Sequence, residues 1–444
     1  MTTTITIPNK PSSVLLGSCL LFAVSMCSSA GVVFDILTTA KEVPPFLAAF
    51  WRLFIQNTVQ LVPFLWSVKN EWRRDGERKM MAFHKEELEL REGDDVNEEE
   101  VQEQEQVPLM PRYLRSLPLC CISGIFLGIH FSMWVFSLRY TSLTHSLLWV
   151  SMGPIVINGG TWFLYLLGVV GMCTRTGMNI IVNKPSNMET SGVFLGIMGA
   201  IIMLVGIQEV GVGNGEDSTF EPNNHGQETV TVNPNSNHPP TLYGDAAAFS
   251  GAVAVCVYLL IGQKLRTFLP IWLYVFPVIG AAAITCFTLA MLDAKDPATL
   301  YGYSNKSAFG FLSKDYLIYA VYLGIGPGIF GHTLLNTLLK HVSPLVVTTA
   351  MLMEPIFGSI IGYFCGLQPL PDPYTWIGGC VLMVGLVLVV IGEKGNENEN
   401  ESQTIEAYRD ESCDDVMEQG DMTTKFIQDK GADEYGHYGS IQKS

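Results

Sequence analysis

Ten apolar stretches, each near the roughly 20 residues that a helix needs to cross a bilayer, account for about half of this 444-residue chain. They lie at 14–34, 46–67, 117–138, 143–167, 191–208, 245–262, 270–292, 316–339, 345–366 and 374–392. Backbone polar groups have no water to bind in lipid, so apolar stretches of this length are expected to be helices. The sequence therefore predicts an all-α membrane protein with ten transmembrane helices.

The first five stretches resemble the last five. Residues 138–154 read LRYTSLTHSLLWVSMGP and residues 339–355 read LKHVSPLVVTTAMLMEP, an ungapped match that places a proline inside the fourth and the ninth stretch. Glycines also recur every seven residues in the closing stretch of each set, at Gly192, Gly199, Gly206 and at Gly378, Gly385, Gly392. A copied set of five spans, an odd number, enters the membrane the other way up. The pattern therefore predicts two inverted five-helix repeats.

Charge is concentrated outside the apolar stretches. Residues 86–106 hold eleven acidic residues against one basic residue, and residues 393–444 hold fourteen against five. Segments so rich in charge and poor in large apolar residues are expected to be disordered and solvated. The net charge of −16 thus describes these segments, and no nucleic-acid partner is expected.

The predicted organisation follows from these boundaries. We expect a cytosolic tail at 1–12 and a first repeat at 13–208, interrupted by a disordered acidic cytosolic loop at 68–116. An Asn-rich outer or lumenal loop at 209–243 precedes the second repeat at 244–392. The acidic segment at 393–444 is expected to be a disordered cytosolic tail.

Basic residues set the orientation, because loops rich in Lys and Arg stay on the cytosolic side. With the amino terminus inside, the cytosolic loops hold fourteen basic residues and the outer loops five, so both termini are predicted to be cytosolic. Two short patterns, Glu105–Met110 and Tyr438–Ile441, resemble sorting signals and favour an endolysosomal or vacuolar membrane. The plasma membrane is an equal alternative for this integral, multi-pass chain.

Cysteines and histidines give no sign of a metal site. Eight of the ten cysteines lie inside the predicted spans and show no paired spacing with histidines, so no metal or cofactor is expected. The chain also lacks the clustered histidines and carboxylates of an intramembrane enzyme. Transport or binding is therefore favoured over catalysis.

Several motifs, in this order along residues 12–394, resemble the drug/metabolite transporter (DMT) superfamily, in particular its EamA type. They are FWRLF with Arg52, RYTSLTHSLL, MEPIFGSIIGYFCG and WIGGCVLMVGLVLV. The resemblance implies ten helices in two repeats and a transporter. The chain departs from the family in its long second and fifth loops and in lacking an acidic residue just after the fourth and ninth helices.

Two charged side chains lie deep in the predicted spans, where lipid disfavours an unpaired charge. Arg52 begins a stripe with Gln56 and Gln60 at helical spacing, which predicts an inward-facing surface; the alternative is a structural arginine bonded to backbone carbonyls. Glu354 precedes Pro355. It is either a structural brace between helices or a group that binds and releases a proton during transport, because burial disfavours a charged carboxylate.

Milder polar residues are expected to line a shared cavity at the middle of the membrane, with an interhelical hydrogen bond as the ordinary alternative for each. The set is His130, Trp134, Ser146, Asn158, His332 and Asn336. Pro154, Pro355 and Pro327 are candidate hinges for alternating access, or simply packing features. With so few fixed charges, the cavity suits an uncharged or zwitterionic solute.

These features favour a transporter that moves a small polar metabolite or drug-like solute by alternating access, with proton or counter-substrate coupling left open. One alternative is a nucleotide-sugar or phosphate-ester antiporter of the same superfamily, which would place more basic residues near the cavity. A second is a non-transporting membrane scaffold or receptor. The expected partners are the lipid bilayer and a small-molecule substrate, and a homodimer is also left open.

Overall fold

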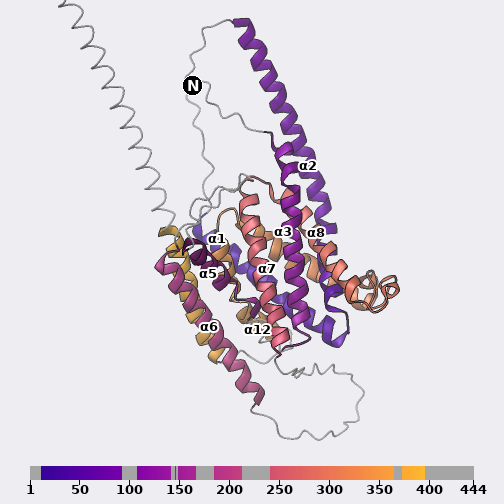
Figure 1. Cartoon of the computed structure of the whole chain (residues 1–444), viewed down its shortest axis with the longest axis vertical. Coiled ribbons are helices and arrows are strands. Elements are labelled where there is room, and N and C mark those ends of the chain that lie inside the picture. The colour runs from indigo at the N-terminus through magenta and orange to yellow at the C-terminus, as the bar shows by residue number, and fades with distance from the viewer. Residues whose placement is uncertain are drawn as a thin grey trace, which may run out of the picture.

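The computed structural model describes residues 12–92, 108–141, 146, 149–166, 185–212, 241–364 and 373–395. These residues are almost entirely helical and include no strand. Six of the helices are long and apolar enough to cross a membrane: Ser13–Thr38, Leu109–Ser137, Leu242–Arg266, Ile271–Asp293, Lys314–Leu338 and Pro373–Gly395. The chain is therefore an integral, multi-pass, all-α membrane protein, as predicted, and Figure 1 shows its helices gathered into one bundle.

Helical residues occur in each of the ten predicted stretches, whereas the number of spans and their inverted order stay predictions. The uninterrupted helices are α1 (Ser13–Asp35), α2 (Pro45–Glu92), α3 (Leu109–Ser137), α6 (Asn187–Val212), α7 (Leu242–Arg266) and α8 (Ile271–Asp293). The helix Pro373–Gly395 is called the closing helix below. A π-helical turn, η1 (Ile36–Ala40), follows α1.

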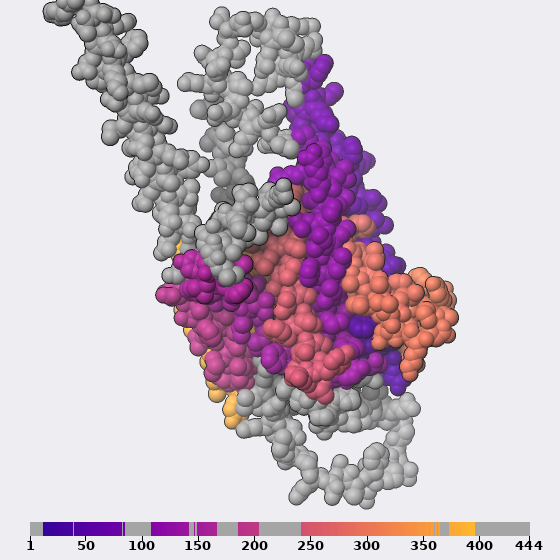
Figure 2. Space-filling view, viewed as in Figure 1, coloured from indigo at the N-terminus to yellow at the C-terminus, as the bar shows by residue number. Residues whose placement is uncertain are grey.

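The main difference from the sequence prediction lies in α2, which continues to Glu92 rather than ending at residue 67. Its 48 residues correspond to about 72 Å, which exceeds the thickness of a whole bilayer. Figure 2 shows the ends of α2 and α3 standing out from the body of the molecule. The expected disorder of 68–116 is therefore wrong for residues 68–92 and 109–116, while residues 93–107 lie outside the described part.

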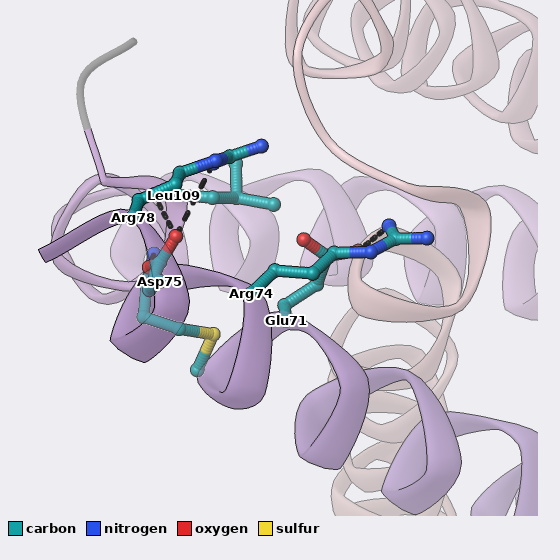
Figure 3. Close-up of polar contacts among 6 residues, drawn as sticks. Glu71, Arg74, Asp75, Arg78 and Leu109 are labelled. Atoms are coloured by element: carbon teal, nitrogen blue, oxygen red, sulfur yellow. Dashed lines mark hydrogen bonds and ion pairs between the residues drawn. The ribbon is translucent and has the colours of Figure 1, made fainter. Parts of the chain in front are cut away.

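A contact with the start of α3 holds α2 at Asp75, eight residues beyond the predicted end of the helix. The carboxylate of Asp75 accepts hydrogen bonds from the first two backbone N–H groups of α3, those of Leu109 at 3.2 Å and Met110 at 2.8 Å. It also pairs with Arg78 at 3.3 Å, as Figure 3 shows. Asp75 thus caps a helix whose own N-cap, Pro108, has no side-chain acceptor. This contact depends on where α3 begins, so the hydropathy of α2 cannot reveal it.

Glycines bring α6 and the closing helix together backbone to backbone. A Cβ placed on Gly199 would lie 2.5 Å from the carbonyl oxygen of Gly378, and one on Gly192 would lie 2.6 Å from that of Gly385. The numbering of these pairs runs in opposite directions, so the two helices are antiparallel. Figure 1 shows them side by side at the edge of the bundle. The predicted seven-residue spacing therefore marks a helix-packing contact.

The fourth and ninth predicted stretches are each broken rather than continuous. The fourth resumes as α5 (Gly153–Leu166), and the ninth consists of α11 (Pro344–Met351) and α12 (Glu354–Phe364). Pro154 and Pro355 are the second residues of α5 and α12, so each follows a break and does not lie mid-helix as predicted. A proline is tolerated there because the first turn of a helix has no intrahelical partner for its N–H.

The eighth predicted stretch changes helix type along its length. It begins as α9 (Lys314–Leu323), becomes the π-helix η5 (Gly324–Thr333) and ends as α10 (Leu334–Leu338). Pro327 lies within η5. Before α9, the link from α8 contains two short 3₁₀ turns, η3 (Pro297–Leu300) and η4 (Gly310–Leu312), and Trp51 of α2 donates to the carbonyl of Ser307 in this link at 3.3 Å.

Candidate functional site

A cavity lies among α1, α2, α3, α7, η5 and the two broken helices. The empty space at this place, counted together with open solvent at its mouth, measures about 500 Å³. Five of the side chains that the sequence singled out line it together: Arg52, His130, Trp134, His332 and Glu354. They come from four separate helical segments, so only the folded bundle brings them to one place.

Arg52 is almost fully buried, with 1% of its surface exposed. Its Nη2 donates to the carbonyl of Pro327 at 3.5 Å, and its guanidinium carbon lies 4.1 Å from the centre of the Phe131 ring. Pro327 has no N–H and sits in a π-helix, so carbonyl groups in this turn are available to side chains of α2. The predicted alternative of a structural arginine bonded to a backbone carbonyl thus describes one of its contacts.

Gln56 and Gln60 face the same π-helix and do not line the cavity. The Nε2 of Gln56 donates to the carbonyl of Gly328 at 2.9 Å, and the Nε2 of Gln60 donates to the hydroxyl of Thr333 at 2.7 Å. Thr333 in turn donates to the carbonyl of Gly328 at 3.2 Å. The polar stripe of α2 therefore stabilises η5, and among its three members only Arg52 reaches the cavity.

Aromatic and imidazole rings form one wall of the cavity. Nδ1 of His130 lies 2.9 Å from the carbonyl oxygen of Gly251 on α7, which holds the ring in place. The ring of Phe131 lies 5.0 Å from that of His332, measured between centroids. The indole Nε1 of Trp134 is buried and has no acceptor among the described residues. This wall thus combines apolar ring faces with one N–H donor, that of Trp134, which has no acceptor among the described residues.

Glu354 is the first residue of α12, immediately after the break, and Gly153 is the first residue of α5 at the matching break. Both line the cavity. Within the described ranges, no basic group lies within 4.0 Å of the Glu354 carboxylate, and no hydrogen bond to it is made. The two broken helices therefore present the same backbone feature to the cavity, but only one of them carries a charge.

The remaining predicted residues lie away from the cavity lining. The hydroxyl of Ser146 lies 2.6 Å from that of Ser137, and Asn336 bonds to Tyr258 and to the carbonyl of His332. Asn158 is buried on α5, and its Oδ1 has no donor among the described residues. For Ser146 and Asn336 the ordinary interpretation, a hydrogen bond that stabilises packing, describes the observed contacts.

Several lining residues were not anticipated. They include Cys27 of α1, Phe131 of α3, Ser151 at the break before α5 and Thr348 of α11. The repeat match offered one signal, because Ser151 lies close to Pro154 and Thr348 lies in the matching segment before Pro355. Cys27 and Phe131 resemble ordinary membrane residues and carry no such signal. Among the described residues, no group of three or more His, Cys, Asp or Glu could hold a metal ion.

Part of the chain matches a known protein family. Residues 242–391 match the family model of the EamA-like transporter family, which is part of the DMT superfamily. The predicted resemblance is confirmed over these residues. No curated protein matches the chain. Among 24 matching chains of solved structures, one described only as "Crystal structure of protein" has a TM-score of 0.50 and 14% identity, and the match covers 86% of this chain and 98% of that one. This likeness concerns the fold alone.

Proposed function

Starting from the match of residues 242–391 to the EamA-like transporter family, we propose that this membrane protein carries a small polar metabolite or drug-like solute through the central cavity by alternating access. One observation carries the proposal. Two helices with matching breaks, α5 and α11–α12, meet at a single cavity that also holds the buried charges Arg52 and Glu354. Broken helices at a central site are typical of secondary transporters.

Inverted repeats at 13–208 and 244–392 would supply the two moving halves. The helix contacts support this arrangement, because they occur in pairs that such a symmetry would relate. Helix α3 packs against α7, and the related helix of the second half, η5–α10, packs against α1. The closing helices of the two halves pack antiparallel through their glycines. In this scheme the prolines Pro154, Pro355 and Pro327 mark the points where the helices would bend.

The charges in the cavity favour a solute with little net charge over a phosphate ester. Arg52 is accompanied by Glu354 and by two histidines, so a doubly charged phosphate would meet one guanidinium and one carboxylate. A nucleotide-sugar or phosphate-ester antiporter therefore stays the second choice. Cytosolic termini, an endolysosomal, vacuolar or plasma membrane, and a homodimer belong to the same proposal and rest on the sequence patterns alone.

Coupling to protons would act through Glu354, which combines a central position with a carboxylate that makes no hydrogen bond in the described structure. If the proposal holds, Glu354→Gln should flatten the dependence of uptake on pH, because no other carboxylate lines the cavity among the described residues. The matched control is Glu77→Gln on the exposed part of α2. A variant at Glu354 that keeps the pH dependence of the wild type would remove proton coupling from the proposal.

The test of transport itself uses the full chain in proteoliposomes. Vesicles are exposed to a mixed metabolite pool under a proton gradient, under a counter-solute gradient and without a gradient, and their contents are read by mass spectrometry. The proposal predicts that at least one small polar solute accumulates beyond protein-free vesicles, and that Arg52→Gln abolishes the accumulation. If no solute accumulates under any gradient, the scaffold or receptor alternative is favoured.

A further inference from the structure

The guanidinium of Arg52 has far fewer partners than its burial calls for. An arginine side chain carries five N–H donors, and the described structure gives this one a single long bond, at 3.5 Å, to the carbonyl of Pro327. Its Nε has no acceptor among the described residues. Water cannot take the place of an acceptor, because only 1% of the residue is exposed. A buried charge with so few hydrogen bonds is costly, which indicates that something else binds it when the cavity is in use.

A second donor with no acceptor lines the same cavity. The indole Nε1 of Trp134 is buried and makes no hydrogen bond in the described part of the chain, and 6% of the residue is exposed. A guanidinium and an indole N–H on the lining of one cavity match the oxygens of a carboxylate, which accept hydrogen bonds only. Apolar surface from Val150, Val255 and Met351 lies on the same lining and suits a hydrocarbon body.

The charged groups that line the cavity balance one another. The titratable or charged groups that line the cavity are Cys27 of α1, Arg52 of α2, His130 of α3, His332 of η5 and Glu354 of α12. Arg52 and Glu354 give one positive and one negative charge, so the cavity is neutral with the histidines and the thiol uncharged. An added anion would leave one uncompensated negative charge in a medium of low dielectric constant, where such a charge is strongly disfavoured.

We propose that the cavity binds a small carboxylate with an apolar body, that Arg52 and Trp134 donate to its oxygens, and that Glu354 takes up one proton as it binds. The proton comes from water and joins a carboxylate oxygen of Glu354, and no bond of the solute forms or breaks. The translocated charge is then zero, because one anion travels with one proton. This inference rests on the proposed function, since it takes the cavity as the site of transport.

Binding to the purified full-length chain, measured by titration calorimetry, tests the inference. The probes are acetate, benzoate and hexanoate, each compared with its amide, which has a similar shape but no charge. At least one acid should bind at least about tenfold more tightly than its amide, because only the acid pairs with the guanidinium. Arg52→Gln should weaken this acid by at least about tenfold, whereas Arg73→Gln on the exposed part of α2 should leave it unchanged.

Two further measurements keep the test decisive. If Arg52→Gln does not fold, Trp134→Phe removes the second donor and should weaken the acid at least about threefold. Repeating the titration in two buffers of different ionisation enthalpy counts the linked protons. We expect about one proton taken up per acid at pH 7.5 in the wild type and none in Glu354→Gln.

The failures of the two proposals can be told apart. If no acid binds more tightly than its amide, or if both donor variants bind it like the wild type, the carboxylate inference is wrong. Uptake of some other metabolite by the wild type would leave the proposed function standing in that case. Carboxylate binding that depends on Arg52, with no uptake of any solute by proteoliposomes, would instead count against transport.

Discussion

The contact between α6 and the closing helix allows a sharp test by adding a single carbon atom. The perturbation is Gly199→Ala, whose Cβ would lie 2.5 Å from the carbonyl oxygen of Gly378 and 2.6 Å from the backbone nitrogen of Leu382. Ordinary contacts of a Cβ begin near 3.4 Å. Both close atoms belong to the backbone, so no side-chain rotation relieves the clash and the two helices have to separate.

The separation required is about 1 Å, the difference between the clash and an ordinary contact. A gap of that size loses roughly a quarter to a half of the attraction of each atom pair that it opens. Overpacking of this kind typically costs about 1–3 kcal/mol, and we expect Gly199→Ala to fall in this range. Gly378→Ala should cost a similar amount, and the double variant should cost less than the sum, because one separation relieves both clashes.

Equilibrium unfolding by SDS in mixed micelles measures these free energies. The matched control is Gly160→Ala on α5, where a Cβ meets nothing within 4 Å. The control should be unchanged or more stable by up to about 1 kcal/mol, since alanine favours a helix. If Gly199→Ala proves as stable as Gly160→Ala, α6 and the closing helix do not pack as described, and this support for the inverted repeat is lost.

Two further predictions concern stability. Asp75→Ala should lower the free energy of unfolding by about 1 kcal/mol, because two N–H groups at the start of α3 lose their cap. The control Glu77→Ala, at an exposed site, should change this free energy by less than about 0.5 kcal/mol. Equal losses in the two variants would contradict the capping role of Asp75. Tyr258→Phe removes a 2.6 Å hydrogen bond to Asn336 and should cost about 1 kcal/mol in the same assay. No loss there would show that this buried bond does not stabilise the fold.

The positions of the helices could be predicted from the sequence, because lipid selects for length and hydropathy. The same reasoning placed the end of α2 at residue 67 and missed its continuation to Glu92. This continuation is polar, and it contacts the start of α3 through Asp75. The same reasoning also placed Pro154 and Pro355 inside continuous helices. The sequence identifies the equivalence of the two prolines, but the break before each one depends on backbone geometry.

The candidate site was predictable where its residues are unusual in a membrane. Arg52 and Glu354 stand out as charges in apolar stretches, and the structure brings both to one cavity. Ser146 and Asn336 were chosen for the same polarity, yet their hydrogen bonds serve packing. Whether a polar side chain faces a cavity or a neighbouring helix depends on helix rotation, and helical spacing alone does not fix this for a helix packed on several sides.

The central claim, that both sides of the membrane reach this cavity in turn, is tested most directly by the accessibility of Thr348, which lines it. In sealed proteoliposomes, Thr348→Cys is treated with a membrane-impermeant methanethiosulfonate reagent added outside or trapped inside, and peptide mass spectrometry reads the modification of residue 348. We predict modification from either side, whereas Lys306→Cys in the exposed link before α9 reacts from one side only. Modification of Thr348→Cys from one side alone would contradict alternating access through this cavity.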